Sequence, residues 1–195
     1  MMKVLVACEY SGVVRQAFRD RGHDAWSCDL LPAADGSEYH FEDDIAFHLH
    51  AGWDLLIAHP PCDHLAVSGA RWFEEKREDG RQQKAIEFFM MLAEYPHISR
   101  IAVENPIGIM STEYRKPDQI VHPWMFGDPY SKSTCWWLKG LPKLEPTVDV
   151  DTADKGEFVI HGGRKLAKWY SNRERKRDMT FPGMAHAMAE QWTNE

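Results

Sequence analysis

The stretch Asp54-Leu-Leu-Ile-Ala-His-Pro-Pro-Cys62 is a short apolar run that stops at two prolines and a cysteine. A run of this length and boundary is typical of a strand buried in a parallel sheet. Open parallel sheets bind their ligands at the carboxyl ends of the strands. Cys62 is therefore a candidate nucleophile, although most free cysteines are simply small buried apolar residues.

Strands and helices alternate around this run, which predicts right-handed crossovers in an α/β fold with a doubly wound, mostly parallel sheet. We expect strands at Lys3–Cys8, Asp24–Cys28, Trp53–Ala58 and Ser99–Glu104, and helices at Val13–Arg21, Asp44–His50 and from about Arg81 to Pro96. Further strands are predicted at Ser133–Leu138 and Glu157–His161, and a closing helix at Met184–Trp192.

Composition narrows the class of protein. With 195 residues, 44% of them hydrophobic, the chain has room for one core and a small appendage. The four cysteines form no Cys-x-x-Cys pair, and neither a signal peptide nor a membrane-spanning stretch is apparent. These features predict a cytoplasmic protein with reduced thiols and no membrane partner.

The formal net charge of -7 argues against a protein coated in phosphate-binding surface. One segment reverses this balance: it contains Trp169 and Tyr170 among the basic residues Arg164, Lys165, Lys168, Arg173, Arg175, Lys176 and Arg177. Such a run can hold a phosphate backbone and stack a base. A solvated surface loop is an equally good interpretation.

Other predicted strand ends carry polar residues. Tyr10-Ser-Gly12 lies between the first strand and the first helix, where a ligand can approach backbone amides closely. Asp29 ends the second strand, where an acid commonly binds ribose hydroxyls, although it could be only a turn residue. Glu104 ends an apolar strand, so desolvation should favour its neutral form and let it donate to a ring nitrogen.

Together these residues resemble the cytosine carbon-5 DNA methyltransferases. Pro61-Cys62 with Ser68-Gly69, and then Val103-Glu-Asn105, look like the family's catalytic segments. Tyr10-Ser-Gly12, Asp29 and Asp44-Ile45 resemble its cofactor-binding elements in the same order. The likeness covers roughly residues 1–110, and the tail Phe181–Trp192 resembles the closing segment more loosely. Short, phage-type members are the most similar group.

The resemblance implies a Rossmann-like S-adenosylmethionine-dependent methyltransferase fold and an enzyme that methylates cytosine through a covalent cysteine adduct. The Cys62 thiolate would add to carbon 6, and Glu104 would stabilise the adduct at ring nitrogen 3, with Asn105 beside it. A base in duplex DNA would have to be flipped out. Cofactor-binding residues would be Tyr10, Ser11, Gly12, Asp29, Leu30, Asp44, Ile45 and Pro60, and Ser68, Arg71, Lys132 and the basic segment would contact DNA.

The chain also departs from the family. Val14 replaces a glycine of the first loop, Met184 replaces an asparagine of the tail, and Lys132 is only a positional counterpart of the base-contacting arginine. We expect a catalytic core at 1–146, a short insertion at 147–171 in place of a target-recognition domain, and a C-terminal segment at 172–195 that packs back on the core.

These departures leave alternatives open. Without a recognition domain, sequence specificity should be low or supplied by a protein partner. The substrate could be single-stranded DNA or a free cytosine nucleotide, or the protein could be an inactive DNA-binding relative. His59, Cys62 and His64 suggest a zinc site only weakly because no second cluster completes it, so no metal is expected. A phage-encoded protein would act in the host cytoplasm.

Overall fold

The computed structural model describes residues 1–161, 164–167 and 180–193. Within these residues, seven strands form one sheet in the order β3-β2-β1-β4-β5-β7-β6. Neighbours from β3 to β5 run parallel, and β7 is antiparallel to both β5 and β6. The strands are β1 Lys3–Ala7, β2 Asp24–Asp29, β3 His40–Glu42, β4 Leu55–Ala58, β5 Arg100–Pro106, β6 Gln119–Val121 and β7 Thr134–Lys139. The predicted doubly wound, mostly parallel sheet is confirmed.

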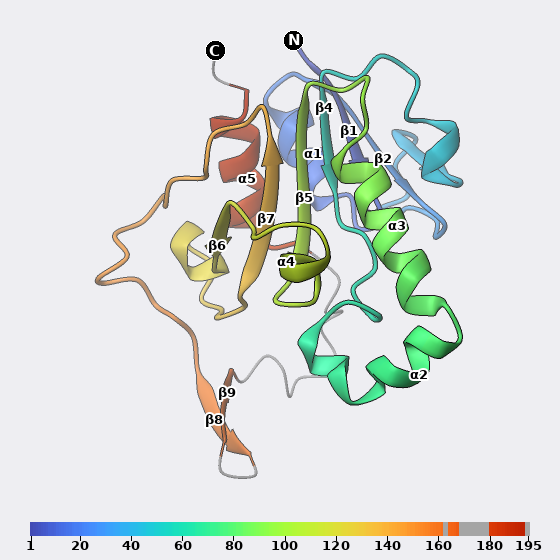
Figure 1. The fold of residues 1–195 in the computed structure, drawn as a ribbon. Coiled ribbons are helices and arrows are strands. Elements are labelled where there is room, and N and C mark those ends of the chain that lie inside the picture. Colours follow the sequence, from blue (N-terminus) through green and yellow to red (C-terminus); the bar gives the residue numbers. More distant parts are fainter. Residues whose placement is uncertain (162–163, 168–179, 194–195) are drawn as a thin grey trace.

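Helices cover both faces of this sheet (Figure 1). Helices α1 (Val13–Asp20) and α5 (Pro182–Gln191) lie on one face, where Val4 and Val6 of β1 join their apolar cluster. Helix α3 (Arg81–Ala93) covers the other face, where Leu5 of β1 is buried in the second cluster. Successive strand residues point to opposite faces, so one central strand supplies both cores.

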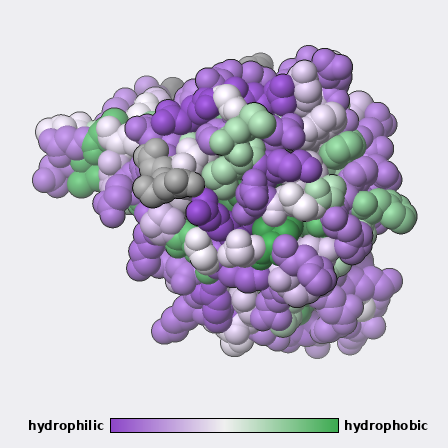
Figure 2. Space-filling view, turned by 90° about the horizontal axis from the view of Figure 1, so that it is seen from above, coloured by the Kyte–Doolittle hydropathy of each residue, from purple (hydrophilic) through white to green (hydrophobic). Residues whose placement is uncertain are grey.

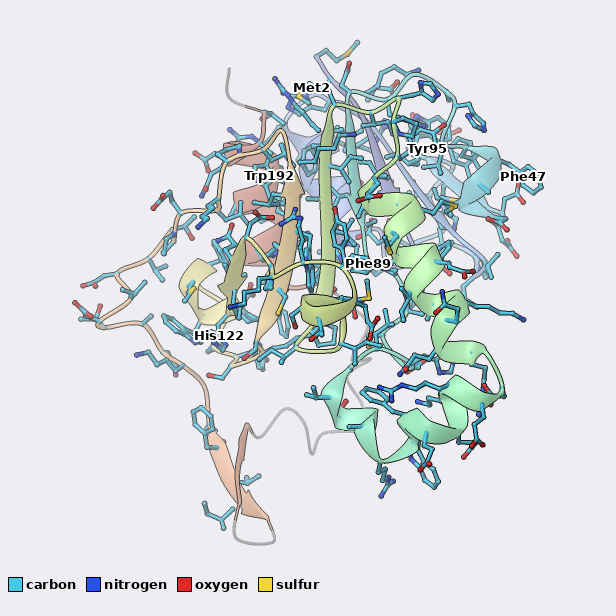
Figure 3. The ribbon with its side chains drawn as sticks, viewed as in Figure 1. Met2, Phe47, Phe89, Tyr95, His122 and Trp192 are labelled. Carbon is cyan, nitrogen blue, oxygen red and sulfur yellow. The ribbon has the colours of Figure 1, made fainter. Side chains whose placement is uncertain are left out.

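Aromatic residues fill both cores. Phe89 of α3, labelled in Figure 3, is fully buried and meets the Trp137 ring edge-on at a centroid distance of 5.1 Å. On the opposite face, Trp192 after α5 meets Trp136 at 5.4 Å. Trp136 and Trp137 are neighbours in β7 and point to opposite faces, so they help hold α5 and α3 against the two faces of the sheet.

Several connections differ from the sequence prediction. The helix expected at Asp44–His50 is only a 3-10 turn, η1 (Ile45–Phe47), which Asp44 caps by accepting a 2.9 Å bond from Ala46 N. The sequence analysis missed the short strands β3 and β6 and the helix α4 (Met110–Glu113). The closing helix begins earlier than expected, since Pro182 occupies its first turn, where a missing N–H costs nothing.

The loop after β4 leads through η2 (Val67–Trp72) and helix α2 (Phe73–Glu78) into α3. Another 3-10 turn, η3 (Pro123–Phe126), separates β6 from β7. Gly183 of α5 packs so closely on η3 that a side chain there would overlap the Phe126 carbonyl group. Met184, beside it, is buried in the core of that face rather than directed at a ligand.

The predicted strand near 157–161 exists, but it lies outside the main sheet. Strand β8 (Phe158–His161) pairs antiparallel with β9 (Arg164–Ala167) as a separate two-stranded ribbon. Figure 1 shows this hairpin projecting from the body of the molecule. The proposed boundaries at 146 and 171 stay predictions, and 168–179 lies outside the described residues.

Within the described ranges, no helix is both long and apolar enough to cross a bilayer. In the view of Figure 2 most of the surface is hydrophilic, and apolar groups are scattered among the polar ones. This surface agrees with a composition in which 27% of residues are charged.

Candidate active site

A cavity of about 530 Å³ lies at the carboxyl edge of the sheet. It is lined by residues that follow β1, β2, β4 and β5, because the carboxyl ends of parallel strands meet at one edge. Seven of its lining residues are ones that the sequence selected: Tyr10, Ser11, Asp29, Pro60, Cys62, Ser68 and Glu104. Lys132, from the segment before β7, is the eighth.

The loops after β4 and β5 are tied together, which fixes Cys62 relative to Glu104. Asn105 Nδ2 donates to the Pro60 carbonyl oxygen at 2.9 Å, and Ile109 N donates to Leu65 O at the same distance. Gly108 lies so close to Leu65 that a Cβ atom would overlap its carbonyl. Asn105 is 1% exposed and does not line the cavity; the structure places it in a contact between the two loops, and its predicted catalytic role stays a prediction.

Cys62 is half-buried and faces the cavity. Burial raises the pKa of its thiol and the carboxylates of Glu104 and Asp63 raise it further, whereas Lys132 and a backbone hydrogen bond lower it by less than this rise. The first helical turn after Cys62, η2, begins only five residues later, at Val67. The free protein therefore holds Cys62 as a thiol.

Glu104 lies two residues before the end of β5 with a side chain that is 14% exposed, and its electrostatics differ from the sequence prediction. Burial raises the pKa of this carboxyl, but the charge of Lys132 and the contact with His59 outweigh burial and lower it overall. The predicted neutral form is therefore wrong for the free protein. Oε2 lies 3.6 Å from His59 Nδ1, whereas Oε1 is buried without a hydrogen-bond partner among the described residues.

The sequence analysis missed Glu9, which lines the other end of the cavity and is 4% exposed. Its carboxylate accepts bonds from Val14 N at 2.6 Å, from Arg15 N at 3.2 Å and from Ser11 Oγ at 3.3 Å. Burial raises the pKa of Glu9, against the opposing effects of His59 and these amides. An acid shortly before a helix start is a capping signal that could have identified it.

Gly12 is required by the backbone turn into α1, whereas its predicted ligand contact stays a prediction. Its φ of 73° is a left-handed conformation, and a Cβ atom would overlap the Arg15 guanidinium, which pairs with Asp35. Arg15 is fully buried and also donates to Ser27 Oγ at 3.1 Å. Gly12 does not line the cavity, so it serves the turn into α1.

The remaining cofactor candidates divide between the cavity and the core. Asp29 lines the cavity and accepts a 3.0 Å bond from Leu31 N. Leu31 lines the cavity in place of the predicted Leu30, which is 76% exposed. Asp44 caps η1 and Ile45 is a buried core residue, and neither lines the cavity.

Of the nucleic-acid candidates, Ser68 and Lys132 line the cavity and Arg71 does not. Arg71 lies in η2, with its guanidinium carbon 5.0 Å from the centroid of the neighbouring Trp72, which is half-exposed. Arg164 and Lys165 belong to the backbone of β9. Lys168, Arg173 and Arg175 lie outside the described residues.

Lys132 belongs to a loop that is anchored on both sides. Ser131 Oγ donates to Lys155 O at 2.8 Å, which ties the loop to the base of the hairpin. Asp128 accepts a 2.8 Å bond from Gly183 N, which ties it to α5. In the described part of the chain, no group of three or more His, Cys, Asp or Glu side chains is arranged to hold a metal ion.

Comparison with known proteins identifies the fold. No family model and no curated protein matches the sequence. An E. coli prophage-encoded protein assigned as a DNA modification methyltransferase superimposes with a TM-score of 0.51 and 18% identity, over 76% of this chain and 52% of that one. The Entamoeba histolytica methyltransferase EhMeth gives 0.54 and 14%, over 76% and 57%.

The chain thus spans little more than half the length of each of these proteins. At these identities the likeness shows the fold alone. Together with the strand order, it shows that this protein has the Rossmann-like fold of methyltransferases. Both structural neighbours carry the name methyltransferase.

Proposed function

We propose that this protein transfers a methyl group from S-adenosylmethionine to carbon 5 of cytosine in DNA, through a covalent adduct with Cys62. The observation that carries the proposal is that one cavity is lined by both Cys62, which follows β4, and Glu104, near the carboxyl end of the adjacent parallel strand β5. The resemblance of the surrounding segments to cytosine carbon-5 methyltransferases and the methyltransferase fold support the same conclusion.

The cavity end near β1 and β2 suits the cofactor. Asp29 presents a carboxylate at the end of β2, where it can accept bonds from ribose hydroxyls. Tyr10, Ser11 and Pro60 line the same cavity and would surround the rest of the nucleoside. When bound, S-adenosylmethionine would supply the electrophilic methyl group. Gly12, Asp44 and Ile45 would act by shaping the loops behind these residues.

The cavity end near β4 and β5 suits a pyrimidine base. Glu104 Oε1 is a buried acceptor whose hydrogen-bonding capacity is not met within the described residues. An N–H group of a cytosine edge would satisfy it, and an unsatisfied buried carboxylate oxygen is costly. Cys62 then lies on the same cavity wall, where its sulfur can reach carbon 6 of the ring.

The charge states of the two residues define the proton transfer. Cys62 starts as a thiol and Glu104 as a carboxylate, so the thiol proton passes by way of Glu104 to ring nitrogen 3 while sulfur bonds to carbon 6. The ring electrons move toward carbon 5 and make it nucleophilic. After methylation, carbon 5 loses its proton to solvent, the carbon–sulfur bond breaks, and the nitrogen proton returns through Glu104.

DNA is the proposed substrate because basic and aromatic residues occur in the cavity lining, in the loop that follows Cys62 and in the hairpin. Lys132 and Ser68 line the cavity, the Arg71–Trp72 pair lies on the loop that follows Cys62, and the hairpin contains Arg164 and Lys165. A cytosine in a duplex would be flipped into the cavity. Specificity would be low or supplied by a protein partner, because the described chain offers only one hairpin for reading a groove.

The test is adduct trapping. The protein is incubated with labelled S-adenosylmethionine and an oligonucleotide that contains 5-fluorocytosine, and denaturing electrophoresis detects a covalent complex. We expect a complex with the wild type and none with Cys62→Ala, while unmodified cytosine acquires label at carbon 5. Absence of both products from a wild type that binds S-adenosylhomocysteine would overturn the proposal and favour an inactive DNA-binding relative.

A free cytosine nucleotide is the second candidate substrate, because the net charge of -7 disfavours phosphate-backbone binding. Deoxycytidine monophosphate, single-stranded DNA and duplex DNA are compared in one assay. Methylation of the mononucleotide at a rate equal to that of DNA would replace DNA with the free nucleotide.

A further inference from the structure

His59 is a buried histidine in the middle of the cavity wall that the chemistry described above does not use. It follows β4, and its backbone N–H donates to Ala7 O at 3.0 Å, which continues the pairing of β4 with β1. Its side chain is 9% exposed, and its ring meets the Trp136 ring edge-on at 6.0 Å. Both its backbone and its ring are therefore held in place.

Two buried carboxylates flank this ring. Nδ1 lies 3.6 Å from Glu104 Oε2, and Glu9, from the β1 loop, is close enough for the two charges to interact. The other titratable groups around the same cavity are Cys8, Tyr10, Asp29, Cys62, Asp63 and Lys132. His59 thus lies between the cofactor end of the cavity and its base end.

The surroundings select one tautomer of His59. Nε2 is buried and has no hydrogen-bond partner among the described residues. A proton on Nε2 would be an unsatisfied buried donor, whereas a proton on Nδ1 points at a carboxylate. The tautomer with its proton on Nδ1 is therefore favoured over the one with its proton on Nε2. A separation of 3.6 Å is long for a hydrogen bond, but such contacts often shorten when a ligand closes the site.

We propose that His59 is a positioning residue for Glu104: its Nδ1–H holds Oε2 and leaves Oε1 directed at the base. The inference rests on the proposed function, since it assigns how the base-contacting carboxylate is prepared. Lys132 supplies the second favourable interaction, and both oppose the effect of burial on the pKa of Glu104. An ionised Glu104 is what the transfer of the thiol proton requires.

Substitutions of His59 can separate the effect of its hydrogen bond to Glu104 from the effect of the space that its side chain fills. In His59→Asn the amide nitrogen occupies the place of Nδ1 and keeps a donor there. In His59→Leu the donor is lost while an apolar side chain fills the space. His59→Gln places its amide nitrogen near the Nε2 position instead, and it provides the same contrast with a polar side chain if His59→Leu does not fold. His50→Asn is the control, because His50 contacts Tyr95 Oη at 2.6 Å outside the cavity.

The first measurement does not require activity. Glutamate labelled with ¹³C at the carboxyl is titrated by NMR, and the Glu104 resonance is assigned by its absence in Glu104→Gln. His59→Leu should raise the titration midpoint of Glu104 by about one pH unit, as expected for a lost hydrogen bond to a carboxylate. His59→Asn should retain most of the wild-type midpoint. An unchanged midpoint in both His59→Leu and His59→Gln would overturn the proposal.

The second measurement is the pH profile of kcat/KM for methyl transfer. Because the carboxylate is the active form, its loss on acidification should begin at higher pH in His59→Leu than in the wild type. His59→Asn should stay close to the wild-type profile, and His50→Asn should not change it. If the wild type transfers no methyl group, the proposed function fails, yet the NMR titration still decides whether His59 sets the state of Glu104.

Discussion

Asn105 Nδ2 donates a 2.9 Å hydrogen bond to the carbonyl oxygen of Pro60, and the bond joins the ends of β5 and β4. Asn105 is 1% exposed, so water cannot replace this donor. Pro60 lies two residues before Cys62, the candidate nucleophile, and Asn105 directly follows Glu104, the candidate base-contacting acid. It therefore determines how Cys62 and Glu104 lie relative to each other.

Replacing Asn105 with Ala should loosen the Pro60–Cys62 segment. The free energy of unfolding should fall by about 1–3 kcal/mol, because a buried carbonyl loses its donor. The rate of adduct formation with 5-fluorocytosine DNA should fall by roughly 10-fold or more, since small displacements of reacting groups are costly. Urea unfolding and adduct trapping measure the two effects.

Ser111→Ala is the control, since Ser111 Oγ donates to Gly108 O at 2.8 Å on the same loop without touching Pro60. It should change stability without changing the rate of adduct formation. Equal loss of rate in both variants would mean that the loop as a whole, and not the bond to Pro60, positions Cys62.

The sequence predicted the sheet well because its strands are short apolar runs with clear boundaries. The run Leu55–Ala58, which stops at Pro60 and Pro61, and Ile101–Val103 before Glu104 carry that signal without tertiary information. β3 and β6 were missed because each has three residues and lies at an edge of the sheet, where the apolar pattern is weak. Their pairing depends on neighbouring strands that no local pattern reveals.

Which residues line the cavity was predictable where they stand near strand ends, whereas charge states that depend on packing were not. Cys62, Glu104 and Asp29 were selected by position alone and line one cavity, and their roles stay predictions. The ionisation of Glu104 could not be predicted from the sequence. Its pKa depends on Lys132, 28 positions along the chain, and on His59, which comes from another part of the sheet. Glu9 was overlooked because its role depends on the amides of α1 that close around it.

A Gly12→Ala variant should be markedly less stable than a Gly36→Ala variant. Both glycines have positive φ, 73° and 67°, so each substitution carries the same backbone cost of about 1 kcal/mol. Only at Gly12 would the added carbon overlap the Arg15 guanidinium; at Gly36 nothing lies within 4 Å. Thermal unfolding of the two variants should therefore differ, and equal melting temperatures would contradict the close approach of Arg15 to Gly12.

The reaction of Cys62 with iodoacetamide should be slow at neutral pH and should accelerate up to pH values above 9. The pKa of its thiol is raised by burial and by Glu104 and Asp63, so little thiolate exists at pH 7. Cys62 should still react before the other thiols, since Cys28 and Cys135 are buried and burial raises the pKa of Cys8 to about 12. Mass spectrometry of digests taken over time identifies the modified residue.

Lys132→Met should slow this labelling further, because Lys132 lowers the pKa of Cys62, and Lys155→Met should leave the rate unchanged. Lys155 is an exposed lysine whose ammonium lies 4.8 Å from the Trp124 ring centroid. A labelling rate that is already at its plateau at pH 7 would contradict the raised pKa of Cys62.

Removal of the β8–β9 hairpin should weaken binding to DNA without disturbing the catalytic cavity. The hairpin forms its own two-stranded ribbon and projects from the body, so a short Gly-Ser linker in place of residues 157–167 should leave the main sheet intact. Phe158 and Ile160 alternate along β8 and are exposed, and Arg164 and Lys165 belong to β9, so an apolar and basic element would be lost.

Fluorescence anisotropy with labelled duplex should show at least about a tenfold weaker complex and a smaller salt dependence, because phosphate contacts release counterions. Labelling of Cys62 in the absence of DNA should remain at the wild-type rate, which shows that the cavity is intact. Unchanged DNA affinity would instead assign DNA binding to the Arg71–Trp72 loop and to the region around Lys132, and Arg71→Ala would then be the variant that weakens the complex.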